Sequence, residues 1–133
     1  MQITRQADYA VRAVLYLAQI DQETRATTKQ IAKEQNIPAS FLAKIIAQLT
    51  VAGLLLTTRG VRGGVTLAKD SEDISLLEVV EAIDGPVLMN SCVNDSYNCP
   101  IDDCPIRPVW CDAHAELVER LRSTNFNGVL ALA

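Results

Sequence analysis

The 133-residue sequence lacks the features that would place it at a membrane or among enzymes. No apolar run approaches the roughly 20 residues that span a bilayer, and residues 1–10 carry early charge instead of an apolar secretion signal. These absences predict a cytoplasmic protein that does not bind membranes. The chain has a single histidine, His114, and no Ser/His/Asp set, paired acid–base carboxylates or cofactor fingerprint. We therefore expect that it is not an enzyme.

Cysteine is absent from most of the chain, and all four cysteines lie between positions 92 and 111. In a reducing compartment, such clustering is typical of metal-binding or redox-active thiols rather than structural disulfides. Cys92, Cys99 and Cys104 lie at spacings of seven and five in a polar, proline-containing segment without a helical pattern. A loop with this composition can fold around a metal.

The spacing of the thiols fits some kinds of site better than others. The gaps of six, four and six residues are wider than the C-x₂₋₄-C knuckles of structural zinc sites. Cysteine can also be a small, inert core residue, but a polar loop fits that interpretation poorly. An iron–sulfur cluster is held by thiolates and tolerates a non-cysteine ligand, so it fits the three loop cysteines better.

The charge is divided unevenly along the chain. The net charge is −4, but residues 1–69 carry a net +5 and residues 70–133 a net −9. A basic half can meet nucleic-acid phosphates, whereas an acidic half should face elsewhere. We expect residues 1–70 to form a DNA-binding region, and residues 71–133 to hold a short helix, the cysteine loop and a dimerisation helix.

Apolar periodicity predicts a mainly α-helical chain with one β-hairpin. Thr27 and Gln30 fit a capping box before the second helix, and Pro38 indicates the start of the third. The glycines around positions 60–64 fit the tight tip of a hairpin. The expected helices cover residues 4–20, 28–34, 38 to about 52, 75–83 and 105–123, with an apolar tail at 126–132 and strands at 54–58 and 65–68.

Helix, short turn, second helix and basic hairpin together indicate a winged helix-turn-helix. In this motif the N-terminal residues of the second helix reach base edges in the major groove, which makes Ser40 and Lys44 candidate contacts. Thr28, at the start of the preceding helix, is a further candidate. Arg59 and Arg62 on the hairpin tip suit a narrow minor groove.

Several segments along the chain jointly resemble one known family. They are the opening Met1-Gln2-Ile3-Thr4 with Asp8-Tyr9-Ala10-Val11, then Ile37–Leu42, the wing Arg59–Gly64, Glu78–Gly85, and three spaced cysteines followed by Trp110. Together they resemble the Rrf-two superfamily of winged-helix transcription regulators. The resemblance implies a homodimer whose long C-terminal helices cross, with Cys92, Cys99 and Cys104 holding an iron–sulfur cluster. Two-fold symmetry then predicts double-stranded DNA with a pseudo-palindromic operator as the partner.

The identity of the fourth ligand is open. IscR-like members of the superfamily have a histidine ligand where this sequence has Arg107, whose guanidinium has no lone pair to give. NsrR-like members take an aspartate from the first helix of the partner subunit, and Asp8 stands at the matching place. This favours a four-iron four-sulfur cluster over a two-iron two-sulfur cluster.

Cys111 competes with Asp8 for that role. On one continuous helix it would lie about 10.5 Å of rise beyond Cys104, which is long for two ligands of one cluster unless the helix starts late. We therefore interpret Cys111 as a packed helix residue or a redox partner thiol.

The leading expectation is a dimeric transcription regulator, acting as a repressor, that senses iron–sulfur status, nitric oxide or redox state. One alternative keeps DNA binding but replaces the cluster with a thiol switch, in which the cysteines are oxidised to sulfenic acid or disulfide. Another is a small iron–sulfur electron carrier, which would show no salt-dependent DNA binding.

Overall fold

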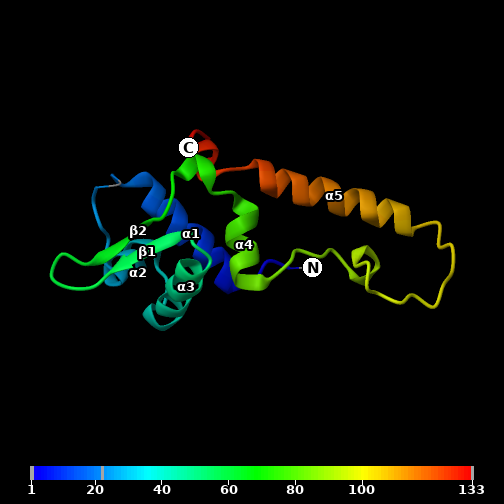
Figure 1. Ribbon diagram of the computed structural model, residues 1–133, viewed down its shortest axis with the longest axis horizontal. Coiled ribbons are helices and arrows are strands. Elements are labelled where there is room, and N and C mark those ends of the chain that lie inside the picture. Colours follow the sequence, from blue (N-terminus) through cyan, green and yellow to red (C-terminus); the bar gives the residue numbers. More distant parts are fainter. Residues whose placement is uncertain (1, 22, 133) are drawn as a thin grey trace.

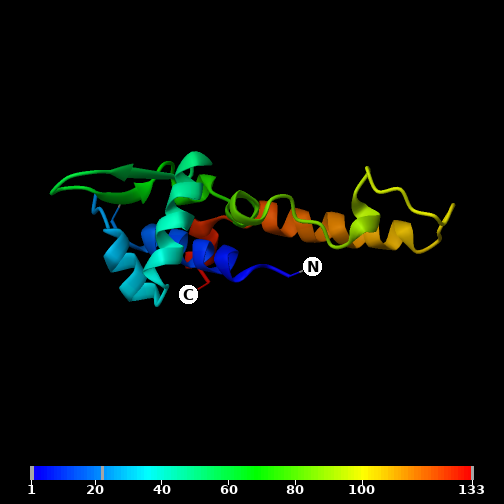
Figure 2. The same cartoon turned by 90° about the horizontal axis from the view of Figure 1, so that it is seen from below.

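The computed structural model describes residues 2–21 and 23–132, which form a compact head and a projecting arm (Figures 1 and 2). The fold is mainly helical with a small hairpin, as predicted. The helices are α1 (Arg5–Gln19), α2 (Thr28–Gln35), α3 (Ala39–Val51), α4 (Leu76–Asp84), α5 (Arg107–Ser123) and α6 (Phe126–Leu130). The strands are β1 (Leu55–Thr58) and β2 (Gly64–Leu67), and the short 3₁₀ turns are η1 (Ser71–Asp73) and η2 (Ser91–Val93).

Helix α1 is the centre of the head, and α3, α4 and α6 all contact it. Its buried residues are Ala7, Ala10, Ala13, Val14 and Leu17. Val11 and Leu15 also pack against the core but are only partly buried. Because neighbours cover α1 on more than one side, its small alanines lie at the closest contacts and the larger side chains lie at the edges.

The turn between α2 and α3 sets the angle of the helix-turn-helix. A capping box starts α2: the Thr27 hydroxyl accepts the Gln30 N–H, and the Gln30 side chain accepts the Thr27 N–H. The helix ends at Asn36, which adopts the left-handed conformation with φ 52°. Ile37 is then buried, and Pro38 forms the N-cap of α3. Pro38 thus immediately precedes the helix that it was predicted to start.

The hairpin pairs β1 with β2 in antiparallel register, from Leu55 opposite Leu67 to Thr58 opposite Gly64. The sequence suggested that its glycines supply positive φ values, but only Gly60 in this tip does so. Gly63 is required for a different reason, because a Cβ there would collide with the carbonyl oxygen of Thr58. The tip therefore depends on close backbone contact as much as on unusual dihedrals.

The arm consists of one segment that runs outward from the head and one helix that returns to it. Residues 86–106 run outward from the end of α4, and α5 returns toward the head (Figure 1). No residue of α5 is buried, although Leu117 and Leu121 near its C-terminus pack against the core formed by Leu77 and Val80. Phe126, just beyond α5, is 1% exposed and fixes the end of the arm in the main core. Within the described residues, no helix combines the length and apolar character that a membrane crossing needs.

Candidate nucleic-acid interface and cysteine pocket

Helix α3 has one face in the core and one in solvent. Leu42, Ile45, Ile46 and Leu49 are buried, whereas Ser40, Ala43, Lys44 and Ala47 are exposed. The exposed residues recur at intervals of three and four, so they share one side of the helix. This side can enter a groove without disturbing the core. The structure therefore leaves Ser40 and Lys44 available to a nucleic acid.

The hairpin tip carries the other predicted basic contacts. Arg59 and Arg62 are exposed in the loop between β1 and β2. Arg25 supports this loop, because its Nη1 donates a hydrogen bond of 3.3 Å to the Arg62 carbonyl oxygen. Ala26 beside it pairs with Val65 as an isolated bridge. Sequence reasoning missed Arg25, since nothing local shows that residue 25 meets the wing.

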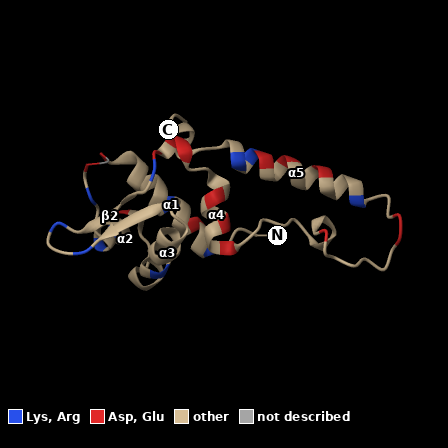
Figure 3. Ribbon diagram, in the orientation of Figure 1, with Lys and Arg blue, Asp and Glu red and all other residues tan. Residues whose placement is uncertain are grey.

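Charge is separated in space as well as in sequence. The ribbon in Figure 3 is blue for basic residues at the wing, on α3 and at the two ends of α5, and red for acidic residues along α4 and the middle of α5. Thr28, at the first turn of α2, is half-buried and lies next to exposed Lys29. The wing and the outer face of α3 thus form a basic surface on the head, and the acidic arm extends away from it.

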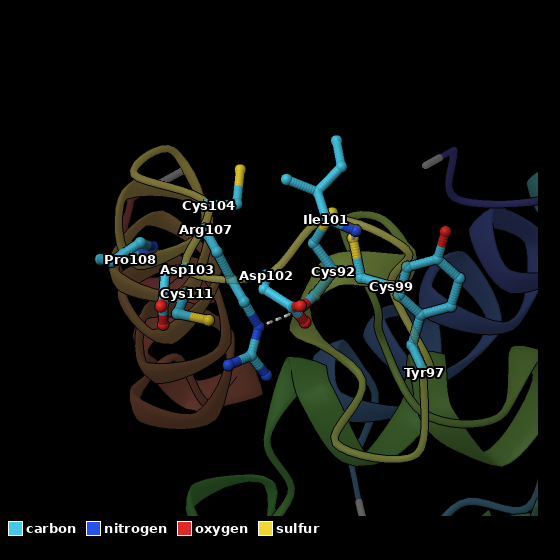
Figure 4. Close-up of a pocket in the computed structure, with 10 residues that line it drawn as sticks. All are labelled: Cys92, Tyr97, Cys99, Ile101, Asp102, Asp103, Cys104, Arg107, Pro108 and Cys111. Carbon is cyan, nitrogen blue, oxygen red and sulfur yellow. Dashed lines mark hydrogen bonds between the residues drawn. The ribbon is translucent and has the colours of Figure 1, made fainter.

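All four cysteines line one pocket of about 470 Å³ at the outer end of the arm (Figure 4). Each is a free, partly buried thiol. Arg107 and Pro108, from the first turn of α5, line the same pocket, and so do Asp102 and Asp103 from the loop. Loop and helix therefore contribute thiols to a shared cavity.

Two hydrogen bonds organise the pocket. Arg107 Nε donates to the Cys92 carbonyl oxygen at 3.2 Å and ties the two ends of the loop together. The Ile101 backbone N–H donates to Cys99 Sγ at 3.4 Å. Hydrogen bonds to cysteine sulfur are among the features that tune iron–sulfur clusters. Arg107 thus connects the first turn of α5 to the backbone at Cys92.

The four cysteines of the pocket have the ligand chemistry of an iron–sulfur cluster, because such clusters are held by cysteine thiolates. Across residues 2–21 and 23–132, however, no three His, Cys, Asp or Glu side chains are arranged so that they could hold a metal ion. The thiols share a pocket but do not converge on a point. Ligation therefore requires the loop to close around its ligand.

Asp8 belongs to α1, which lies in the head, whereas the pocket lies on the arm (Figure 1). Its carboxylate Oδ2 is 3.3 Å from Arg12 Nε. That nitrogen is buried and has no hydrogen-bond partner among the described residues, so the contact is an ion pair without hydrogen-bond geometry. Arg12 is further held by a 2.9 Å bond to the Gln35 carbonyl oxygen. The structure does not bring Asp8 and the cysteines together.

Comparison with known proteins places these features in one family. Residues 3–131 match the Rrf2 family, described as an iron-dependent transcriptional regulator. The chain belongs to the Rrf2 family. It is 34% identical over 109 residues to the HTH-type transcriptional regulator NsrR of Halalkalibacterium halodurans, covering 82% of this chain and 72% of that protein. It is 31% identical over 124 residues to protein rrf2 of Nitratidesulfovibrio vulgaris, covering 92% and 83%.

Solved structures show the same fold. CymR, the global cysteine regulator of B. subtilis, superposes with a TM-score of 0.84 at 22% identity, covering 100% of this chain and 98% of CymR. IscR of T. potens gives a TM-score of 0.80 at 27% identity, with 98% and 87% covered. This Rrf2 chain is therefore a winged-helix, DNA-binding transcription regulator and not an enzyme.

Proposed function

We propose that this chain is a dimeric regulator whose cysteine pocket holds an iron–sulfur cluster, and that the cluster couples iron–sulfur status, nitric oxide or redox state to DNA binding in the cytoplasm. The observation that carries the proposal is the pocket at the end of the arm, lined by every cysteine of the chain. Cys92, Cys99 and Cys104 are the ligands from the loop. When bound, the cluster supplies a centre that responds to oxidants and small diatomic molecules.

DNA contact is assigned to the basic surface of the head. Ser40 and Lys44, on the exposed face of α3, contact base edges and phosphates in the major groove. Arg59 and Arg62 enter the neighbouring minor groove from the wing tip. Thr28, at the N-terminus of α2, contacts the phosphate backbone, where helix N-termini favour anions.

Dimerisation is assigned to the arm. Val109 and Trp110 in the outer half of α5 are 55% and 36% exposed, so this helix leaves apolar surface uncovered along the arm. A second copy related by two-fold symmetry would cover the same surface on both chains. Two heads held in this way read two half-sites, which predicts a pseudo-palindromic operator.

Coupling follows from how the arm is built. The loop is tied to α5 through Arg107, and the C-terminal part of α5 packs on α4 through Leu117 and Leu121. Closing or opening the loop therefore acts on a helix that is fixed in the core of the head at its other end. Closure of the loop around a bound cluster would thereby favour one of two arrangements of the arms, and hence of the DNA-binding heads.

We propose a four-iron four-sulfur cluster over a two-iron two-sulfur cluster, because this chain resembles NsrR-like members at Asp8 and departs from IscR-like members at Arg107. A guanidinium has no lone pair with which to ligate iron, so the histidine-containing ligand set of IscR-like members cannot form here. The fourth ligand comes from Asp8 of a second protomer or from Cys111.

The test is anaerobic purification followed by metal analysis and operator binding. Purified or reconstituted protein is expected to be brown, with iron and acid-labile sulfide in equal amounts. A variant with Cys92, Cys99 and Cys104 all changed to serine is expected to stay colourless and to keep its helical circular dichroism. Colourless wild-type protein with intact thiols that cannot be reconstituted would overturn the proposal.

A cluster-free thiol switch is the second candidate. The observation that favours it is that four partly exposed free cysteines share a pocket without converging on a metal position. This candidate expects mild peroxide to convert defined thiols to sulfenic acid or disulfide. Thiol titration with mass mapping, performed on metal-free protein together with operator binding, separates it from the cluster proposal.

A further inference from the structure

The pocket contains one more thiol than the loop supplies. Cys92, Cys99 and Cys104 come from the segment that leads to α5, and Cys111 comes from α5 itself. We propose that Cys111 is the fourth ligand of the cluster, so that each protomer holds its cluster entirely with its own cysteines. This inference rests on the proposed function, because it names a ligand of the same site.

The start of α5 brings Cys111 within reach. The sequence pattern placed the helix start near residue 105, but α5 begins at Arg107 after an N-cap at Ile106. Cys111 is therefore four residues inside the helix, with about 6 Å of rise from its first residue. Cys104 lies outside the helix, in a turn that the Arg107 N–H closes by donating to the Cys104 carbonyl oxygen at 3.3 Å.

Cys111 also lies on the side of α5 that borders the pocket. Arg107 and Cys111 are separated by four residues and lie on the same side of α5. Both line the pocket together with Pro108, whereas Val109 and Trp110 do not. Figure 4 shows Cys111 and Arg107 among the residues that line the pocket.

Cys111 and Asp8 differ in what must change before they can ligate. Asp8 lies in the head, paired with Arg12 at 3.3 Å, so it would have to leave that partner and reach the pocket of another protomer. Cys111 needs only to lose its thiol proton to solvent as the sulfur binds iron. Thiolate is also the softer ligand, the type that iron–sulfur clusters select over carboxylate.

A ligand on α5 would be held in place by the helix, whereas the loop ligands must move. The three loop thiols lie outside α-helix, with Cys92 in a single 3₁₀ turn, and they must move inward to converge. Cys111 is held by a 17-residue helix that continues to the head. The cluster would then join the loop directly to the arm helix, and occupancy would not depend on a second protomer.

The test compares thiol reactivity in apo and reconstituted protein, using ferrous iron and sulfide under anaerobic conditions. Each cysteine is alkylated with iodoacetamide and mapped by mass spectrometry. All four thiols are expected to be protected in the loaded protein, and all four to react after the iron is chelated. Equal reactivity of Cys111 in both states would overturn the inference, and failure of the wild type to load would instead overturn the proposed function.

Variants provide a second measurement. Cys111→Ser is expected to lower iron and sulfide per protomer as strongly as Cys92→Ser does, and Asp8→Asn is expected to load like the wild type. Circular dichroism of the apo proteins controls for folding. Full loading of Cys111→Ser with an unchanged absorbance spectrum, together with loss in Asp8→Asn, assigns the fourth ligand to Asp8 and ends the inference. If both variants lose the cluster, the alkylation map of the loaded wild type decides whether Cys111 is a ligand: protection of Cys111 supports the inference, and full reactivity overturns it.

Discussion

At the scale of single residues, Glu78 links the start of α4 to Lys69, which follows the wing. Its carboxylate accepts the Ser75 N–H at 2.9 Å in the capping box of α4, and its other oxygen accepts from Lys69 Nζ at 3.0 Å. Partial burial by itself raises the pKa of Glu78, but the hydrogen bonds from Ser75 and Lys69 and the charge of Lys69 outweigh it. The net pKa is therefore lowered.

The lowered pKa makes stability depend on pH at the acid end. A carboxyl whose pKa is lower in the folded protein stabilises it above the ordinary value of about 4.3, and this contribution is lost as the pH falls through the lowered pKa. Glu78→Gln keeps an acceptor for the cap but not the charge. We expect urea unfolding to show the variant less stable than the wild type at neutral pH, with the difference vanishing in strong acid.

Ser75→Ala is the matched control for Glu78→Gln. It removes the reciprocal cap, in which Ser75 Oγ accepts the Glu78 N–H at 3.1 Å, and is expected to cost about 1 kcal/mol. Most of that loss should persist in acid, since a hydroxyl does not titrate. A Glu78→Gln deficit of the same size at every pH would show that the charge has no part in it.

At the scale of elements, the wing depends on a close approach that only glycine allows. A Cβ on Gly63 would meet the Thr58 carbonyl oxygen and the Arg59 carbonyl carbon, both of which are backbone atoms. Gly63→Ala is therefore expected to destabilise the hairpin by roughly 1–3 kcal/mol and to displace Arg62. Operator affinity should fall, while far-ultraviolet circular dichroism keeps its helical signal.

Val61→Ala provides the control at the same tip, because Val61 is fully exposed and its truncation leaves the backbone alone. Its affinity for the operator should match that of the wild type in fluorescence anisotropy. Wild-type affinity in Gly63→Ala would mean that the wing geometry does not govern DNA binding.

Most elements could be predicted because their signals are local. The capping box at Thr27, the proline before α3 and the glycine-rich tip each act through neighbouring backbone atoms, and the helices begin and end within a few residues of the predicted bounds. The burial of individual side chains could not be predicted in this way, because it depends on contacts between elements. Which side chains of α1 are covered depends on its contacts with α2, α3, α4 and α6, and spacing along one helix does not show these contacts.

The cysteine pocket could be predicted only in part. Clustering pointed to the loop thiols, but the place of Cys111 depends on where α5 begins. Successive residues of a helix are turned by about 100°, so a change of start by two residues alters both its distance from Cys104 and the direction of its side chain. That start is set by the turn before Arg107 and by its bond to the Cys92 carbonyl oxygen, a contact between residues 15 apart.

At the scale of the whole molecule, the proposed dimer covers the apolar surface that Val109 and Trp110 expose on the arm. We expect Val109→Glu to convert the dimer to a monomer in light scattering after gel filtration, because a charge would be buried in the proposed interface. Val51→Glu is the matched control, since Val51 is 90% exposed in the head and should leave the dimer intact. A dimeric Val109→Glu protein would place the interface elsewhere.

The separation of charge predicts that the salt dependence of operator affinity arises from the basic residues of the head. Lys44 is exposed on the outer face of α3, and Lys44→Ala removes one cation from each head. If each lysine meets a phosphate, the slope of log K against log salt should become shallower by about 1 per protomer. The measurement is anisotropy of a labelled operator at several salt concentrations.

Lys69→Ala carries the same change in net charge and serves as the control. Lys69 also belongs to the basic half of the sequence, but its Nζ is paired with Glu78 at 3.0 Å, so removing it breaks an ion pair instead of a phosphate contact. Its salt slope should equal that of the wild type. Equal losses of slope in Lys44→Ala and Lys69→Ala would show that net charge, and not the α3 surface, governs binding.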